Sequence, residues 1–253
     1  MLGQVIAWSG IALEVLLLIR GFRGKLLARY PVFYSYILFV CSQSLLRFFV
    51  YHLRPQSYST VYWITEWLGI IAGCGVVFEI YRVGLAAYPG TARMARNLLA
   101  FVFVIAFTKA VVETWNDPHW WLVATTMDLE HALRTVQALS IVALVVLFVF
   151  YSIPFGRNLR GVLLGYGLFV GESVVWLTFA SSGSHKFHQF WSYVHPAAYS
   201  VVLVVWAVHL WSYAQNPEPK RAVRLEEQYQ RVAAATGRRL RAGRGYLAKV
   251  VGS

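Results

Sequence analysis

Long, nearly uncharged apolar stretches recur along this chain and limit its fold more than any other feature. A helix needs about 20 mostly apolar residues to cross the ~30 Å hydrocarbon core of a bilayer. Because unpaired backbone groups in lipid cost several kcal/mol each, such stretches must be helical. The sequence therefore predicts an all-α polytopic membrane protein, a seven-transmembrane-helix bundle. Its seven spans are approximately Leu2–Ile19, Val32–Tyr51, Val61–Tyr81, Asn97–Val112, Asp128–Tyr151, Leu159–Ser181 and Phe190–Tyr213.

Composition excludes the soluble classes of protein. Of the 253 residues, 58% are hydrophobic and only 13% are charged, whereas soluble domains are about a quarter charged. A soluble enzyme, a disordered protein and a disulfide scaffold are thereby excluded. The two cysteines, Cys41 and Cys74, lie in apolar runs at different depths, so we expect small buried side chains rather than a disulfide.

The distribution of Lys and Arg predicts the orientation. The segments after the first, third and fifth spans carry four, three and two of them, and the chain beyond Pro219 carries nine, which makes 18 of the 23. The opposite loops carry only Arg54 and Lys186. Cytoplasmic loops are enriched in Lys and Arg, so the amino terminus is expected outside and the carboxyl terminus in the cytoplasm. The predicted location is the cell membrane (the inner membrane), and the net charge of +12 reflects topology rather than a nucleic-acid partner.

Two regions are expected: residues 1–213 as the transmembrane domain and residues 214–253 as a basic amphipathic cytoplasmic tail. The first apolar run precedes its cations, unlike a secretory signal, so we expect it to remain as a spanning helix. In the tail, Lys220–Leu240 alternates Arg and Glu with apolar residues. Such a helix can lie on the anionic lipids of the inner leaflet; a solvated, topology-setting tail is the alternative.

Several ionisable residues fall inside the predicted spans. Each costs about 2.5–3.5 kcal/mol or more in lipid, so they should face the bundle interior and have partners. At 1.5 Å per helical residue, the outer half of the membrane holds Glu66, Lys109, Arg134 and Glu172, with Arg47 nearer the outer interface. These residues predict either a polar cavity open to the outside, with Glu172 as its deepest acid, or a static network. Interhelical pairs such as Glu172–Arg134 and Glu66–Arg47 would form that network.

Helical spacing groups further polar residues with these. Glu130, Arg134 and Gln137 stand at i, i+4 and i+7 and so share a face, as do Gln43 and Arg47 at i, i+4. Glu172 and Arg134 are the expected recognition charges. The full predicted ligand-binding set is Glu172, Arg134, Glu66, Lys109, Arg47, Gln43 and Gln137.

Other intramembrane residues are expected to be structural. Glu79 should extend to the inner interface near Arg82, and Glu14 should pair with a lysine or arginine there. Glycines at small-xxx-small spacing favour close helix contact within the chain, with a dimer face as the alternative. These glycines are Gly69, Gly73, Gly75, Gly161 and Gly165.

Metal and cofactor signals are weak. His185, His188 and His195 could offer imidazoles to zinc, but no two of them have the His-x3-His spacing of zinc ligands on a helix, and solvated side chains are the preferred interpretation. The chain has no glycine-rich phosphate loop and no Gly-x-Ser-x-Gly nucleophile motif. We expect no cofactor, and the sequence disfavours an enzyme.

Short matches at a shift of about 130 residues relate the second and third spans to the sixth and seventh. Chance similarity between apolar segments is the alternative interpretation. The resulting 3+1+3 layout resembles that of microbial rhodopsins and of SWEET-type sugar transporters. However, Phe190–Tyr213 lacks the lysine that retinal requires, and only Pro196 falls inside a span, so neither family is assigned.

Three functional hypotheses fit the sequence. The first is a sensor or receptor-like protein that binds a small polar ligand in an outward-facing cavity and couples to a cytoplasmic partner. The second is a small-solute transporter with the 3+1+3 layout. The third is a non-catalytic structural subunit of a membrane complex, in which the intramembrane charges only hold helices together.

Overall fold

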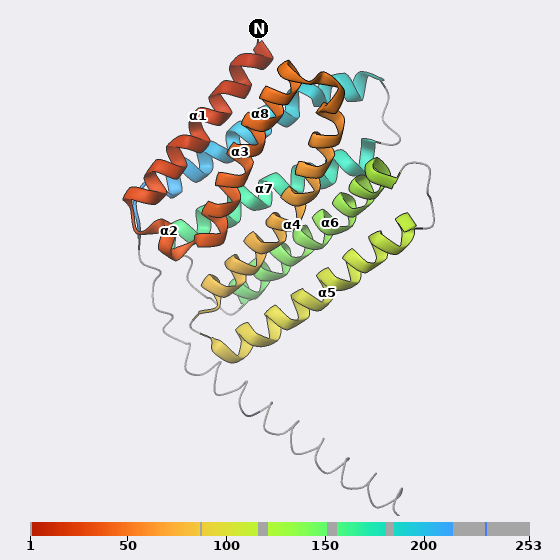
Figure 1. Ribbon diagram of the computed structural model, residues 1–253. Coiled ribbons are helices and arrows are strands. Elements are labelled where there is room, and N and C mark those ends of the chain that lie inside the picture. The colour runs from red at the N-terminus through yellow and green to blue at the C-terminus, as the bar shows by residue number, and fades with distance from the viewer. Residues whose placement is uncertain are drawn as a thin grey trace, which may run out of the picture.

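The computed structural model describes residues 2–86, 88–115, 121–150, 156–180, 185–214 and 231, and this part of the chain is helical with no strand. Figure 1 shows the long helices running alongside one another. The prediction of an all-α protein is confirmed. The long helices are α1 (Leu2–Arg23), α3 (Pro31–Leu53), α4 (Tyr58–Gly84), α5 (Pro89–Trp115), α6 (Trp121–Phe150), α7 (Arg157–Ala180) and α8 (His185–His209). A short α2 (Leu26–Arg29) and a 3-10 turn, η1 (Pro55–Ser57), connect neighbours.

Five segments are long and apolar enough to cross a membrane, counted over the described residues: Pro31–Leu53, Pro55–Gly84, Glu130–Val149, Arg157–Phe179 and Gln189–His209. The chain is therefore a multi-pass membrane protein. α1 and α5 do not belong to this set. α5 carries three cations along its length: Arg93, Arg96 and Lys109.

Several helices are longer than the apolar stretches that predicted them. α5 begins at Pro89 rather than Asn97, and α6 begins at Trp121 rather than Asp128. Apolarity marks only the part of a helix suited to hydrocarbon, whereas backbone hydrogen bonding continues into more polar sequence. Proline suits the first turn of α5 because it lacks an N–H group that would have no partner there.

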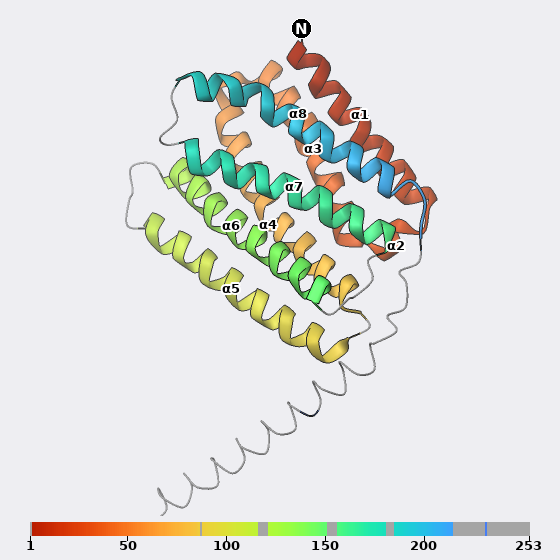
Figure 2. The same ribbon diagram turned by 180° about the vertical axis from the view of Figure 1, so that it is seen from behind.

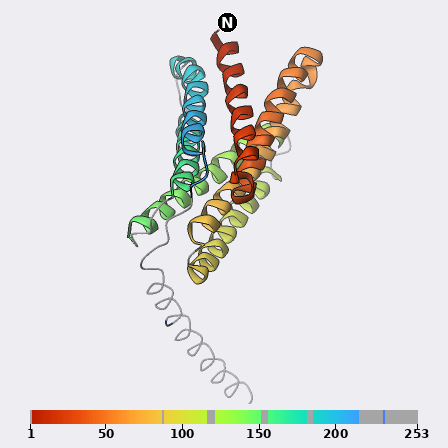
Figure 3. The same cartoon turned by 90° about the vertical axis from the view of Figure 1, so that its left-hand side faces the viewer.

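The helices pack mainly as sequential pairs. α3 contacts α4, α5 contacts α6 and α7 contacts α8, while α1 packs against both α3 and α8. Figure 2 shows α5, α6, α7 and α8 in this order across one side of the molecule. At the end where the chain begins, α8 and the start of α4 lie on opposite sides of α1 (Figure 3). α6 contacts both α4 and α7 and so joins the two sides.

Glycines allow α7 to approach its neighbours closely. A Cβ atom at Gly165 would meet the indole of Trp206, and one at Gly161 would meet His209, both on α8. A Cβ atom at Gly73 on α4 would meet the hydroxyl of Tyr166 on α7. At these three positions the small-residue spacing serves contacts within the chain.

Glu79 lies beside Arg82 as expected, but it also contacts the beginning of α3. Its side chain is buried, and its two carboxylate oxygens accept the backbone N–H groups of Val32 at 3.0 Å and Phe33 at 2.7 Å. The first N–H groups of a helix have no partner within the helix, and Glu79 of α4 satisfies two of them for α3. Arg82 also contacts it, at 3.2 Å. The position of a residue along its own helix does not reveal which helix end lies beside it, which is why the contacts with α3 were not expected.

Glu14 also differs from expectation. It is buried, and its Oε1 accepts a hydrogen bond from the hydroxyl of Tyr199 at 2.6 Å, where a lysine or arginine was expected. This bond connects α1 to α8, which are neighbours only in the folded chain.

Asn158 joins the beginning of α7 to the end of α8. Its Nδ2 donates to the carbonyl oxygens of His209 at 2.8 Å and Ser212 at 2.9 Å. Its Oδ1 accepts the N–H of Ala214 at 2.5 Å. The side chain is fully buried and satisfies backbone groups where the helix ends. α8 accordingly ends at His209, before the expected Tyr213.

Candidate ligand-binding site

A cavity of about 230 Å³ lies between α3, α4, α6, α7 and α8. Pockets for drug-sized ligands have roughly 300–1,000 Å³, so this cavity suits a smaller molecule. Its walls combine aromatic rings with charged and hydroxyl groups. The lining residues are Tyr36, Val40, Gln43, Ser44, Arg47, Tyr62, Glu66, Gly69, Glu130, Arg134, Phe169, Ser173, Trp176, His195 and Tyr199.

Arg47 on α3 has many partners. Its Nη2 contacts Oε2 of Glu66 at 3.1 Å and donates to the carbonyl of Tyr62 at 3.0 Å, and its Nε donates to Oγ1 of Thr65 at 2.8 Å. The guanidinium also lies 4.2 Å from the centre of the Tyr62 ring. The expected Glu66–Arg47 contact is thus present. Arg47 is held on one wall of the cavity and joins α3 to α4.

Arg134 on α6 interacts with Glu130, with the Phe169 ring and with the hydroxyls of Tyr36 and Tyr166. Only 3% of its surface is exposed, and its Nε lies 3.5 Å from Oε1 of Glu130, one turn earlier on the same helix. The guanidinium lies 4.6 Å from the centre of the Phe169 ring. Its Nη1 is buried and has no hydrogen-bond partner among the described residues, and the same is true of Oε1 of Gln43. An unsatisfied buried polar group costs about 1–3 kcal/mol, more when charged, so both atoms require a partner from within the cavity.

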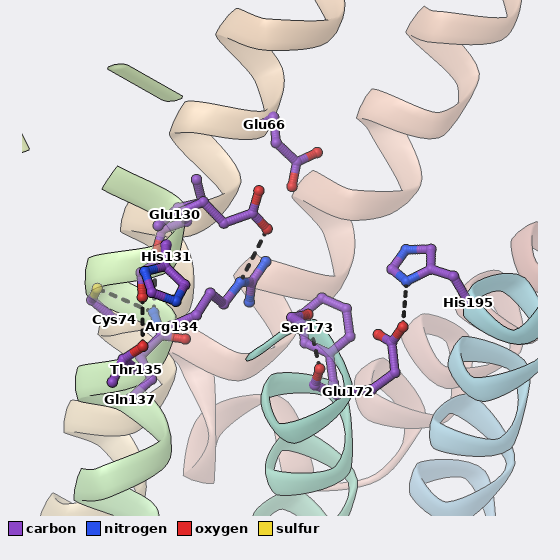
Figure 4. Close-up of polar contacts among 12 residues, drawn as sticks. Glu66, Cys74, Glu130, His131, Arg134, Thr135, Gln137, Glu172, Ser173 and His195 are labelled. Carbon is purple, nitrogen blue, oxygen red and sulfur yellow. Dashed lines mark hydrogen bonds and ion pairs between the residues drawn. The ribbon is translucent and has the colours of Figure 1, made fainter. Parts of the chain in front are cut away.

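Glu172 lies beside the cavity, but it is not among the residues that line it. Its Oε1 accepts a hydrogen bond from Nε1 of Trp191 at 3.0 Å and lies 2.8 Å from Nδ1 of His195. In Figure 4, Glu172 points toward His195, whereas Arg134 points toward Glu130. The sequence suggested a contact between Glu172 and Arg134. Instead, Glu172 pairs with His195, and Arg134 pairs with Glu130. Counting residues gives the depth of a side chain but not the direction in which it leaves its helix.

Gln137 belongs to a hydrogen-bond network rather than to the cavity lining. Its Oε1 accepts from the hydroxyl of Tyr166 at 3.1 Å. Its Nε2 contacts the carbonyl of Ile70 at 3.4 Å and Sγ of Cys74 at 3.3 Å. Gln137 is fully buried. Its hydrogen bonds join α4, α6 and α7, which indicates a structural role.

Lys109 is not brought to the cavity. Its side chain is exposed on α5, and no described residue of α5 lines the cavity. Similar depth in the membrane was the reason for including it, and depth alone does not separate the interior face of a helix from the exterior one.

Sequence reasoning missed the aromatic part of the site. Tyr36, Tyr62, Phe169, Trp176 and Tyr199 all line the cavity, yet in the sequence they resemble other aromatic residues of a membrane helix. The hydroxyls of Ser44 and Ser173 were missed for a similar reason. Glu130 was recognised on the face of Arg134 but left out of the predicted binding set.

The aromatic wall continues outward from Trp176. Its ring stacks with Trp191 at a centroid distance of 5.9 Å and an interplanar angle of 17°, and with Phe187 at 6.0 Å and 9°. Trp191 also donates to Glu172. The stack therefore connects the cavity wall with the Glu172–His195 pair.

In the described part of the chain, no three His, Cys, Asp or Glu residues come together in a way that could hold a metal ion. Of the three histidines considered, His195 pairs with Glu172. The side chains of His185 and His188 lie outside the described residues.

No protein-family model matches the chain, and neither does any curated protein or solved structure. Function must therefore be argued from the chemistry of the site itself.

Proposed function

We propose that this protein is a sensor or receptor-like membrane protein that binds a small polar ligand in the cavity between α3, α4, α6, α7 and α8. In this proposal α1 and α5 join the five apolar segments as spans. The clustering of Lys and Arg in one set of loops supports an outer amino terminus and a cytoplasmic carboxyl terminus. The cavity then opens in the outer half of the membrane.

The contrast between two arginines is the observation that carries this proposal. Arg47 donates to Glu66, Tyr62 and Thr65, as expected of a residue that only holds helices together. Arg134 is more deeply buried, but its Nη1 has no hydrogen-bond partner in the described part of the protein. A polar ligand bound in the cavity would satisfy this buried N–H group.

Contacts between the cavity and the inner ends of the helices favour a sensor over a transporter. The Gln137–Tyr166 network, the Glu79 contacts with α3 and the Asn158 contacts with α8 all hold helices together in this region. The five apolar segments are also continuous helices apart from the turn at Pro55–Ser57, and α8 continues through its internal Pro196. Transporter sites, in contrast, commonly use interrupted helices.

A transporter remains the second candidate because of where the cavity lies. It is lined by both helix pairs of the proposed repeat, α3–α4 and α7–α8. Alternating access in such folds takes place around a site between the repeats.

Coupling to a cytoplasmic partner would use the inner loops and the tail. Residues 215–253, apart from Arg231, lie outside the described residues. Binding of the tail to anionic lipid, or to a protein partner, therefore stays a prediction.

A cavity-filling variant tests the proposal. A Cβ atom at Gly69 would lie 3.6 Å from the Phe39 ring and 3.7 Å from Oε1 of Gln43, which are ordinary contacts. Gly69→Leu should thus fold and occupy the cavity. Gly171→Leu is the matched control, since Gly171 has open space around it and does not line the cavity.

The assay is thermal unfolding of the full chain in lipid nanodiscs, measured against a library of small polar metabolites. A ligand at 100 times its Kd stabilises by about 2.7 kcal/mol, which raises Tm by about 5–11 °C at roughly 2–4 °C per kcal/mol. We expect this shift in the wild type and in Gly171→Leu but not in Gly69→Leu. Equal shifts in both variants, or no stabilising compound, would overturn the proposal. Flux of the stabilising compound into proteoliposomes would instead select the transporter.

A further inference from the structure

The ionisable groups that line the cavity balance in charge. The lining carries two arginines, Arg47 and Arg134, and two acids, Glu66 and Glu130, while His195 pairs with Glu172 beside it. Placing an additional net charge in a low-dielectric site is costly unless it is compensated. A ligand with zero net charge therefore suits this lining better than a simple anion or cation.

Charged groups of opposite sign nevertheless lie close together in the cavity. Nε of Arg134 and Oε1 of Glu130 are 3.5 Å apart. Figure 4 shows the carboxylates of Glu66 and Glu130 in the same region as the guanidinium of Arg134. A ligand that contacts this region meets a donor and acceptors within a few ångströms.

Two buried atoms that lack a hydrogen-bond partner within the described residues belong to residues that line the cavity, and they specify complementary groups on the ligand. Nη1 of Arg134 requires a hydrogen-bond acceptor, and Oε1 of Gln43 requires a donor. A guanidinium pairs best with a planar carboxylate, whereas an ammonium offers three donors for amide and carboxylate oxygens. A carboxylate and an ammonium on one carbon atom would satisfy both atoms without changing the net charge.

We infer that the ligand is a zwitterion of the α-amino-acid class. Its carboxylate binds Arg134, and its ammonium binds between Gln43, Glu66 and Glu130. This inference rests on the proposed ligand-binding function and specifies its ligand. The cavity of about 230 Å³ also has aromatic walls formed by Phe169 and Trp176, so an amino acid with an apolar side chain is preferred.

The test compares L-leucine and L-phenylalanine with analogues that each lack one charge. For leucine these are leucinamide, which has no carboxylate, and 4-methylpentanoate, which has no ammonium. Binding to the full chain in nanodiscs is measured by calorimetry. We expect at least one of the two amino acids to bind, and both of its analogues to bind more weakly by about tenfold or more, since each loses a charge-assisted contact.

Glu130→Gln provides a test that misfolding cannot imitate. The change leaves the lining with one net positive charge, so the variant should bind the amino acid more weakly and 4-methylpentanoate more tightly than the wild type does. A gain in affinity for the anion cannot arise from a damaged fold. Arg134→Lys keeps the charge but loses the planar donor pair, and should weaken binding of the amino acid by about tenfold.

The failure of this inference can be distinguished from the failure of the proposed function. The inference of a zwitterionic ligand is wrong if 4-methylpentanoate binds the wild type as tightly as leucine does, or if a neutral polyol is the strongest ligand in the metabolite library. In either case the proposed ligand-binding function stands. If no compound binds the wild type, both proposals are wrong.

Discussion

Replacing Asn158 with alanine removes three hydrogen bonds that join α7 to the end of α8. At about 1 kcal/mol each, their loss should lower the free energy of unfolding by about 3 kcal/mol. The decrease in the free energy of unfolding is larger if water cannot reach the backbone groups that lose their partner. For a chain of this size, 1 kcal/mol shifts Tm by roughly 2–4 °C, so the expected decrease is about 6–12 °C. Thermal unfolding in nanodiscs, followed by tryptophan fluorescence, measures it.

Arg157→Ala is the matched control at the neighbouring position. Nη2 of Arg157 also bonds to Ser212, at 2.8 Å to the carbonyl and 2.6 Å to Oγ, but these bonds are exposed. Exposed substitutions usually change stability by no more than about 0.5 kcal/mol, so this variant should melt within about 2 °C of the wild type. If the Asn158 and Arg157 variants melt at the same temperature, Asn158 does not hold the end of α8 as described.

Two further substitutions test the packing in the same unfolding assay. Gly165→Ala places a methyl group against the Trp206 indole and should destabilise by about 1–3 kcal/mol through overpacking. Gly171→Ala has open space and should be no less stable than the wild type; equal loss in both variants would contradict the close α7–α8 contact. Tyr199→Phe removes the hydroxyl that donates to buried Glu14 and should cost about 1–3 kcal/mol, and unchanged stability would show that this bond does not hold α1 against α8.

The helical fold could be predicted because bilayer physics leaves few alternatives to long apolar helices. The lengths of the stretches did not predict which helices contact one another. Glu79 and Asn158 show the reason most clearly. Each satisfies the end of a helix distant in sequence, and no local pattern at either residue identifies the helix that lies beside it.

The candidate site could be predicted only in part. Counting from the ends of the spans grouped Glu66, Arg134 and Arg47, and all three line the cavity. The same count also grouped Lys109 and Glu172, which do not line it. Lining a cavity depends on rotation about the helix axis and on the identity of the neighbouring helices. A single sequence carries little information about either.

The stacked indoles of Trp176 and Trp191 give this protein an internal optical probe. Two indoles with a centroid separation of 5.9 Å are close enough for their electronic transitions to couple, which produces an exciton signal in circular dichroism. The first ring belongs to the cavity wall, and the second donates to Glu172. Displacement of either ring by an incoming molecule would alter the signal, so occupancy can be followed on unlabelled, unmodified protein.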